Sequence, residues 1–436
     1  MIYEYGTLQL LQGMSERSRT PLFDLVFLLS DTMDMVTRAV RNHHYRVAYI
    51  ASAIASELGL TSHERTNLLL AGALHDCGAL SLRERINTLQ FEMEHPQLHA
   101  ERGYLLLSVF RPLQEAAALI RYHHTQWQWG AGSSVGEQPV PAASHILHLA
   151  DRIAVLVNGV RGGLSQAKEI YRRIEEQSGR MFVPQFVDAF RELCRREYFW
   201  LDLLSPSLGS ILSRTTQPHT IELGKDELLG LGDTLRRMID FRSPYTATHS
   251  MGVAVVAESL ARSVHFPEGQ CQLMKVAGHI HDLGKLAIPR EVLEKPSTLT
   301  AKETQLVHRH PYLTYRTLEV VKGTDELNSW ASFHHERLDG KGYPFHVKAE
   351  DLSLGSRIMA VADVFTAITE DRPYRKGMQR RETAQTLEGM ARASALDGDV
   401  VSTLMLYFDE FNAARIAAQK TSTGQYQQLV GALGHC

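Results

Sequence analysis

The sequence predicts an all-α protein built as a tandem of two helical-bundle domains. Apolar residues recur at helical spacing through most of the 436 residues, and strand-like alternation is hard to find. Two capping boxes, Thr61 with Glu64 and Thr300 with Glu303, mark the starts of helices. A pattern of His and Asp residues in the first half of the chain recurs in the second half. The periodicity predicts the all-α fold class, and the repeat predicts two domains in tandem.

The composition is that of an ordinary soluble globular protein, with 44% hydrophobic and 22% charged residues. Because the formal net charge is −3, we expect neither a nucleic-acid polymer nor an anionic membrane as a partner. No apolar run reaches the ~18 residues that a membrane span needs. The cysteines show no paired spacing: Cys77, Cys194, Cys271 and Cys436. We therefore expect a cytoplasmic protein with reduced thiols.

In chain order, the first half reads as helices over 21–60, 61–75, 111–124 and 144–160. Helical periodicity continues to about Leu204, and residues rich in Ser, Pro, Gly and Thr follow. These breakers predict a first domain over 1–205, a linker over 206–222 and a second domain over 223–436. Beyond about residue 381 the second domain again reads as helices.

The repeat is specific in its spacing. In each half 32 residues separate a His from a His-Asp pair, as in His43 to His75 and His249 to His281. A later His precedes an adjacent His pair by 24 and 25 residues, and an Asp on an apolar helix completes each set. The first set is His43, His75, Asp76, His99, His123, His124 and Asp151. The second set is His249, His281, Asp282, His310, His334, His335 and Asp363.

Five imidazoles and two carboxylates from several helices suit two divalent ions bridged by a shared carboxylate and a hydroxide, which can hydrolyse a phosphodiester. Neighbouring residues of a helix point about 100° apart, so His281 and Asp282 cannot easily chelate one ion in the way that an i, i+4 pair would. We expect Asp282 to bridge, with His249, His281 and Asp363 on one ion and the other three histidines on the second. The partition stays open, since two of those histidines are also adjacent. The ligands favour iron or manganese, with zinc or nickel as alternatives.

Two residues after the His-Asp pair carry further expectations. Gly284 fits a helix end in the left-handed conformation, which would aim the pair into a cleft. Lys285 places a positive charge beside the metals and suits a phosphate oxygen; the alternative is a surface lysine. The first half has Ala79 at the position of Lys285.

Residues 245–376 resemble the HD-GYP branch of the HD phosphohydrolase superfamily. The resemblance rests on His-Asp-x-Gly-Lys at 281–285, His-His-Glu-Arg-x-Asp-Gly-x-Gly-Tyr-Pro at 334–344 and Asp-Arg-Pro-Tyr-Arg at 371–375, with His249, His310 and Asp363 in matching order. It covers about a third of the chain. It implies a metal-dependent phosphodiesterase that opens bacterial 3′,5′-linked cyclic dinucleotides, cyclic di-GMP or 3′3′-cGAMP, to linear dinucleotides through a metal-bridged hydroxide. The tandem layout, a degenerate HD domain before an HD-GYP domain, resembles enzymes that open 3′3′-cGAMP.

The resemblance also implies roles for individual residues. Asp282 and Lys285 would be catalytic, and the substrate would be bound by Lys285, Tyr343, Arg372 and Arg375. Tyr343 either stacks on a base or stiffens its loop. The family's third metal site uses a Glu four residues before the first His; Tyr245 stands there, so we expect two ions.

The first domain lacks the Gly-Tyr-Pro loop, and we expect it to be a structural or regulatory partner that supports a homodimer or signalling contacts. Its ligand-type residues all persist, so a vestigial metal site and a metal-free domain are both open. Two alternatives for the whole chain differ in class. One is an HD phosphohydrolase of mononucleotides or alarmones, and the other is a non-catalytic scaffold that binds cyclic dinucleotides.

Overall fold

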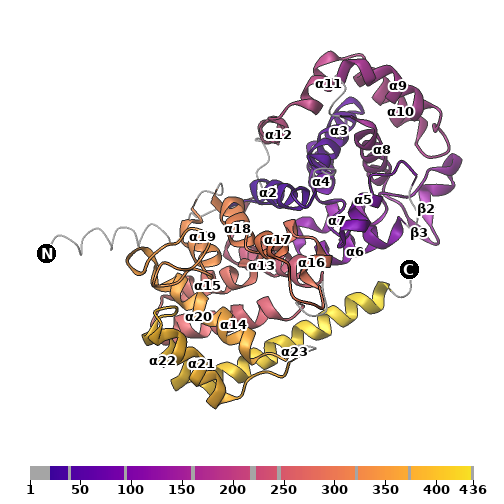
Figure 1. Cartoon of the computed structure of the whole chain (residues 1–436). Coiled ribbons are helices and arrows are strands. Elements are labelled where there is room, and N and C mark those ends of the chain that lie inside the picture. The colour runs from indigo at the N-terminus through magenta and orange to yellow at the C-terminus, as the bar shows by residue number, and fades with distance from the viewer. Residues whose placement is uncertain are drawn as a thin grey trace.

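The computed structural model describes residues 20–37, 41–92, 96–158, 163–216, 222–242, 247–319, 323–371 and 375–433. They form two helical bundles that pack against each other (Figure 1), the first coloured indigo to magenta and the second salmon to yellow. The all-α prediction is confirmed. No helix among these residues is long and apolar enough to cross a membrane.

The first bundle contains ten α-helices and two short 3-10 helices among its described residues. In order they are α2 (Leu22–Asp34), α3 (His43–Glu57), α4 (Ser62–Leu74), α5 (Leu82–Asn87), α6 (Gln97–Leu107), η2 (Arg111–Leu113), α7 (Gln114–Arg121), η3 (Gln128–Ser133), α8 (Ala142–Leu156), α9 (Gly163–Glu175), α10 (Pro184–Cys194) and α11 (Glu197–Leu204). Helix α12 (Leu208–Thr216) follows, and its Leu208 and Leu212 are buried. Much of the segment that we predict to be a linker is therefore helical and packed.

The second bundle follows the same plan. In order it contains α13 (Lys225–Asp240), α14 (His249–Ser263), α15 (Glu268–Ile280), η5 (Leu283–Ala287), α16 (Arg290–Leu293), α17 (Ala301–Val307), α18 (His310–Glu319), α19 (Asp325–Ser332), η6 (Ala349–Asp351), α20 (Leu354–Thr369), α21 (Arg380–Arg392), α22 (Gly398–Leu406) and α23 (Phe408–Leu433). The described strands are two residues long: β1 (Thr20–Pro21) pairs with β4 (Glu222–Leu223), and β2 (Ser134–Val135) pairs with β3 (Gln138–Pro139), both antiparallel.

The repeat in the sequence is a repeat in the structure. His43 and His249 are the first residues of α3 and α14, and His75 and His281 directly follow the last residues of α4 and α15. The Asp that completes each set lies inside α8 or α20. Both predicted capping boxes are present, at the starts of α4 and α17. Each bundle therefore delivers its ligand-type residues from the same positions.

The expectation of a left-handed Gly284 is wrong, because this residue is not among those with positive φ. A Cβ atom at Gly284 would lie 2.0 Å from the carbonyl oxygen of His310. The glycine is needed because α18 approaches the backbone of the His-Asp turn too closely for any side chain. This contact sets the position of His310 relative to Asp282.

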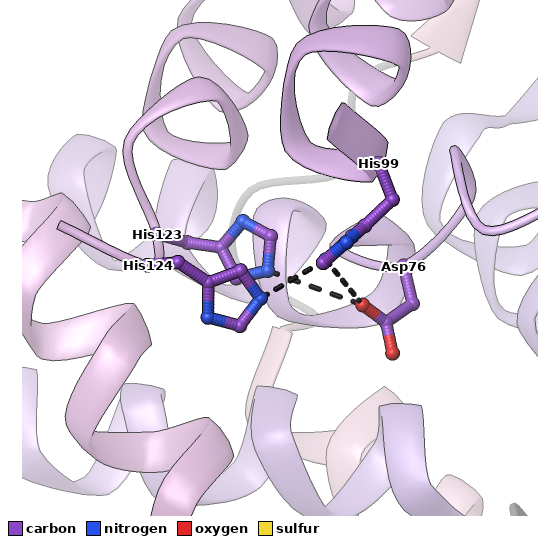
Figure 2. A group of neighbouring side chains, drawn as sticks. All are labelled: Asp76, His99, His123 and His124. Carbon is purple, nitrogen blue, oxygen red and sulfur yellow. Dashed lines mark hydrogen bonds and ion pairs between the residues drawn. The ribbon is translucent and has the colours of Figure 1, made fainter. Parts of the chain in front are cut away.

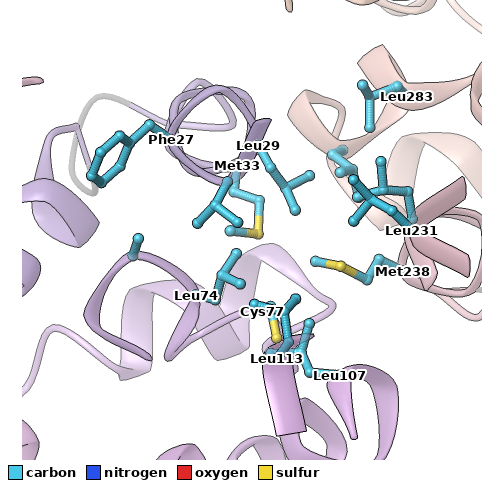
Figure 3. Packing of buried hydrophobic residues seen from close by; sticks show 14 of the residues in the cluster. Phe27, Leu29, Met33, Leu74, Cys77, Leu107, Leu113, Leu231, Met238 and Leu283 are labelled. Atoms are coloured by element: carbon cyan, nitrogen blue, oxygen red, sulfur yellow. The ribbon is translucent and has the colours of Figure 1, made fainter. Parts of the chain in front are cut away.

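The two bundles share one hydrophobic cluster. Figure 3 shows its central part, where α2 lies between residues of both bundles: Phe27, Leu29, Met33, Leu74, Cys77, Leu107, Leu113, Leu231, Met238 and Leu283. A buried hydroxyl pair adds a polar contact, with the Oγ1 atoms of Thr32 and Thr317 2.8 Å apart. Helix α23 also reaches across to α6. Continuous apolar packing of this kind fixes one bundle against the other.

Arg242 connects the backbone turns that follow the two His-Asp pairs. Its guanidinium donates to the carbonyl oxygens of Lys285 at 2.6 Å and Ile288 at 2.8 Å in the second bundle. It also donates to the carbonyl oxygen of Leu80 in the first bundle at 3.3 Å. Arg242 is only 2% exposed. Because hydrogen bonds from a buried charged donor are strong, this residue fixes both turns relative to each other.

We predict that Arg242→Met lowers the free energy of unfolding by about 2–4 kcal/mol, because three buried carbonyl groups lose their charged donor. Denaturant unfolding followed by circular dichroism measures the change. The control is Arg392→Met on exposed helix α21, with an expected change within about 0.5 kcal/mol. Equal stability of the two variants would contradict the inference that Arg242 fixes the two turns relative to each other.

We also predict that a fragment spanning residues 223–436 is less stable than the whole chain and self-associates. Separation from the first bundle would expose Leu231, Met238 and Leu283, which are now buried. Size-exclusion chromatography with thermal unfolding tests this. The prediction would be overturned if the fragment were monomeric and if its stability and activity matched those of the second domain in the full chain.

Candidate metal centre

The seven ligand-type side chains of the second bundle meet in one place, and most come from helix ends. His249 begins α14, His281 directly follows the last residue of α15 and His310 begins α18. His334 and His335 follow the end of α19. Asp363 alone projects from the middle of a helix, α20. Helix ends are suited to this role because the chain changes direction there and neighbouring residues can face the same point.

One half of the centre forms around His249, His281 and Asp363. The Nε2 atom of His249 lies 3.1 Å from Oδ1 of Asp363, and Nε2 of His281 lies 3.9 Å from the same oxygen. Asp282 joins this group, with Oδ2 3.3 Å from Nε2 of His281. Ligand atoms of His249, His281 and Asp282 all lie within 4.8 Å of one another. The adjacent His-Asp pair does face one point, because α15 ends at Ile280 and Asp282 departs from helical geometry, with φ −92° and ψ 13°.

The other half contains His310, His334 and His335, whose ligand atoms also lie within 4.8 Å of one another. Nε2 of His310 is 3.2 Å from Nε2 of His334 and 3.2 Å from Oδ1 of Asp282. The two oxygens of Asp282 therefore face different halves of the centre. Nδ1 of His335 lies 3.9 Å from Oδ2 of Asp363, which gives a second carboxylate between the halves.

Backbone carbonyls fix the orientation of three of the rings. The Nδ1 atoms of His281, His310 and His334 lie 2.7–2.9 Å from the carbonyl oxygens of Gly278, Val307 and Ala331, each three residues earlier. Since a carbonyl only accepts, Nδ1 carries the proton and the Nε2 lone pair faces the centre. This is the usual support for a metal-binding histidine.

Burial and charge prepare these groups for a cation. Burial lowers the pKa of His310 to about 3 and holds the pKa of His334 well below its ordinary value. Burial opposes the charge on Asp282, but His281 and Lys285 still hold the pKa of this carboxyl well below its ordinary value. Ionised carboxylates beside neutral imidazoles are the donor set that divalent transition-metal ions bind. The residues present therefore fit a metal centre.

His249 and His281 differ from His310 and His334, because neighbouring carboxylates raise the pKa of both rings against the effect of burial. Burial disfavours the charge of His249, but Glu370 and Asp363 raise its pKa to about 10. Nδ1 of His249 lies 3.2 Å from Oε1 of Glu370, while Nε2 faces Asp363. A metal ion at Nε2 would supply the positive charge that the second proton supplies otherwise. Glu370 would then hold the ring through Nδ1.

Of the predicted substrate-binding residues, Lys285 and Tyr343 lie at the exposed edge of the centre. The Lys285 ammonium pairs with Oδ2 of Asp282, and 22% of its side chain is exposed. Tyr343 lies 4.8 Å from the ring of His335, between ring centroids. Arg375 is exposed and donates to the Ala367 carbonyl at the end of α20. Arg372, and Tyr245 at the position of the family's third-site Glu, lie outside the described residues.

The loop over 336–347 is held by contacts that the sequence did not suggest. Both oxygens of buried Glu336 accept from backbone N–H groups of Phe345, His346 and Val347. Tyr343 stacks on His308, with centroids 4.1 Å apart and planes 9° apart. These contacts favour the interpretation that Tyr343 stiffens its loop.

Comparison with known proteins identifies the architecture. A family model described as "HD domain" matches residues 233–400, and a second of the same description matches residues 40–156. The chain is a tandem HD-domain protein.

Two relatives match this tandem HD-domain protein over most of their length. A 3′3′-cGAMP-specific phosphodiesterase 1 of Vibrio cholerae is 29% identical over 404 residues, 91% of this chain and 94% of the relative. The corresponding phosphodiesterase 3 is 26% identical over 412 residues, 82% and 88% of the two chains. A cyclic di-GMP phosphodiesterase of Pseudomonas aeruginosa is 41% identical over 144 residues, 33% of this chain and 35% of the relative.

A solved structure has the same fold. The crystal structure of a cyclic GMP-AMP-specific phosphodiesterase of Vibrio cholerae matches with a TM-score of 0.61 and 22% identity. The match covers 90% of this chain and 98% of that one. The tandem arrangement of two HD folds is therefore shared along nearly the whole of both chains.

The first HD domain brings together all seven of its predicted ligand-type residues. They form two groups within 4.8 Å, Asp76 with His99, His123 and His124, and His43 with His75 and Asp151. The carboxylate of Asp76 faces both groups, with Oδ1 3.2 Å from Nε2 of His99 and Oδ2 3.5 Å from Nε2 of His75. The arrangement parallels that of Asp282.

The second HD domain depends on one residue that sequence analysis missed. Glu370 is buried, contacts Nδ1 of His249 and accepts a hydrogen bond from Gln419 on α23 at 3.0 Å. The only signal in the sequence is its place just before the Asp-Arg-Pro-Tyr-Arg motif. Glu370 is a positioning residue, because it acts through the ring of His249.

We predict that Glu370→Ala weakens metal binding to the second HD domain by about 10–100-fold, because His249 loses the acceptor that orients its ring. Titration of the metal-free protein with Mn²⁺ by isothermal calorimetry measures the effect. Glu388→Ala, on the exposed face of α21, is the control. Unchanged affinity in Glu370→Ala with a native circular dichroism spectrum would rule out the positioning role.

Proposed function

We propose that this tandem HD-domain protein is a metal-dependent phosphodiesterase that hydrolyses 3′,5′-linked cyclic dinucleotides to linear dinucleotides. The observation that carries the proposal is the position of Asp282. One of its oxygens faces His281 and the other faces His310, and Lys285 lies beside it at the partly exposed edge. A shared carboxylate between two histidine groups, with a cation beside it, suits attack on a phosphodiester.

Different residues of the centre have different roles in the proposed reaction. Two divalent ions, iron or manganese by ligand type with zinc or nickel as alternatives, would supply an activated water and neutralise charge on the phosphoryl oxygens. His249, His281 and Asp363 hold one side of the centre, and His310, His334 and His335 hold the other. The Lys285 ammonium contacts a phosphate oxygen and stabilises the charge that develops there. Catalysis therefore depends on Asp282 and Lys285.

The exposed edge of the centre admits the substrate. The side chain of His335 is 29% exposed, in contrast to the buried His281 and His310. Tyr343 lines this edge as part of a loop fixed by Glu336. Arg372 and Arg375 follow α20 and contribute guanidinium groups that can bind the second phosphate of a cyclic dinucleotide.

3′3′-cGAMP is the preferred substrate in this proposal, with cyclic di-GMP as the alternative. The relatives that match across both HD domains are named for 3′3′-cGAMP. A relative named for cyclic di-GMP matches over about a third of the chain. The shared layout of the two domains is what supports 3′3′-cGAMP.

A turnover assay tests the proposal. Wild-type protein loaded with Mn²⁺ should convert 3′3′-cGAMP to its linear form, and cyclic di-GMP more slowly, as followed by liquid chromatography. Asp282→Ala should lose bound metal and activity together. Lys285→Met should keep its metal and lose about 10²–10³-fold in kcat, the effect of removing one charge-stabilising group.

The matched control is Lys376→Met, whose side chain is 92% exposed and pairs with Asp371 on the surface. It should retain full activity. Turnover confined to noncyclic nucleotides would replace the proposal with a different HD phosphohydrolase. Tight binding of a cyclic dinucleotide without cleavage by the metal-loaded protein would replace it with a signalling scaffold.

A further inference from the structure

The first HD domain contains a cluster of ligand-type atoms that is more deeply buried than the proposed catalytic centre. Figure 2 shows Asp76, His99, His123 and His124 converging from three segments of the bundle. Nε2 of His99 lies 2.9 Å from Nε2 of His124 and 3.2 Å from Oδ1 of Asp76. On the other side of Asp76, Nε2 of His43 lies 3.3 Å from Oδ1 of Asp151.

Some of these atoms have no hydrogen-bond partner in the described chain. They are Nε2 of His75 and of His123, whereas Nε2 of His43 and the Oδ1 atoms of Asp76 and Asp151 face only other ligand-type atoms of the cluster, at 3.2–3.3 Å. The Nδ1 atoms of His75 and His123 donate to the carbonyl oxygens of Gly72 and Ile120, so their Nε2 lone pairs point into the cluster. Each buried polar atom without a partner costs about 1–3 kcal/mol. Lone pairs and carboxylate oxygens directed at one point are the features of a cation site.

Arg152 closes this cluster at Asp151. It is 1% exposed, and its Nη2 atom lies 2.5 Å from Oδ2 of Asp151. The same guanidinium donates to the carbonyl oxygens of Thr88 at 2.9 Å and Phe91 at 3.2 Å, and also to that of Gln90. Helix α8 is thereby tied to the segment that follows α5. The counterpart of Arg152 in the second domain is Val364, which offers no such bonds.

The burial of the two centres differs accordingly. The side chain of Asp151 is 1% exposed, against 10% for Asp363. His124 is buried, whereas its counterpart His335 is partly exposed. Arg152 satisfies only one oxygen of Asp151 and none of Asp76, so its charge does not substitute for a cation among the histidines. This centre therefore has no exposed edge through which a phosphodiester could enter.

We propose that the first HD domain holds a buried structural centre for divalent transition-metal ions, sealed by Arg152 and unable to admit substrate. Its donor set of nitrogen and oxygen atoms selects ions of the Fe²⁺, Mn²⁺, Co²⁺ and Zn²⁺ class. The inference does not depend on the reaction of the second domain. Metal in this centre crosslinks α3, α4, α6 and α8, which otherwise leave buried polar atoms unsatisfied.

The centre is continuous with the contact between the domains. Asp76 begins the turn that leads to Leu80, and the carbonyl oxygen of Leu80 accepts from Arg242. Metal binding at Asp76 thus fixes a segment that Arg242 joins to the turn around Lys285. Loss of this metal lowers the stability of the whole chain.

The test uses the full-length protein with two matched double variants, stripped with chelator and reloaded with Co²⁺ alone. Asp282→Ala/His334→Ala disables the second centre, and Asp76→Ala/His123→Ala disables the counterpart positions in the first. After desalting, mass spectrometry of the metal should find that each variant retains about half of the wild-type Co²⁺. Absence of Co²⁺ from Asp282→Ala/His334→Ala, in a protein with a native circular dichroism spectrum, would overturn the proposal.

Two further measurements use Asp282→Ala/His334→Ala, in which the first centre is intact and the second is disabled. Co²⁺ should raise its melting temperature by several degrees, since a ligand that binds only the folded state stabilises it. Release of Co²⁺ to EDTA from Asp282→Ala/His334→Ala should be many-fold slower than release from Asp76→Ala/His123→Ala. Adding Arg152→Val to Asp282→Ala/His334→Ala should make the release faster. No Co²⁺-dependent rise in melting temperature would overturn the structural role, and equally fast release from both double variants would overturn the seal.

Discussion

The structure depends on presenting nitrogen and oxygen ligands from the ends of separate helices. At a helix end the last carbonyl groups have no partner within the helix. In three histidines of the second domain such a carbonyl, three residues earlier, accepts from Nδ1 and leaves Nε2 directed inward. The same contact recurs at His75 and His123 in the first domain. The fold thus sets the tautomer and direction of these five rings before any ion is bound.

The two HD domains show how one fold supports an open and a sealed centre. Their ligand sets are equivalent, but the residue after the last Asp is Arg152 in one and Val364 in the other. A buried guanidinium that bonds both the carboxylate and nearby carbonyls closes the first centre. The second centre instead has Lys285 beside its shared carboxylate and a histidine partly exposed to solvent. The shared core and Arg242 keep the two centres in a fixed relation.

Features that depend on residue spacing could be predicted from the sequence. The helices, both capping boxes and the tandem repeat follow from periodicity and from the 32-residue steps, and the structure confirms them. The second-domain ligands identified from the repeat do converge, although their roles as metal ligands stay predictions. Contacts across the fold could not be predicted in this way. Glu370 and Arg242 act through residues distant in sequence, and Gly284 serves a close backbone approach rather than a left-handed turn.

The central claim is that the second domain gathers two metal ions around Asp282. An anomalous difference map from crystals of the holoprotein, collected at the absorption edge of the bound metal, tests this most directly. The account predicts two peaks in the second domain, one beside His249, His281 and Asp363 and one beside His310 and the adjacent histidine pair. A map with no peak near Asp282, from crystals in which the protein contains metal, would contradict it.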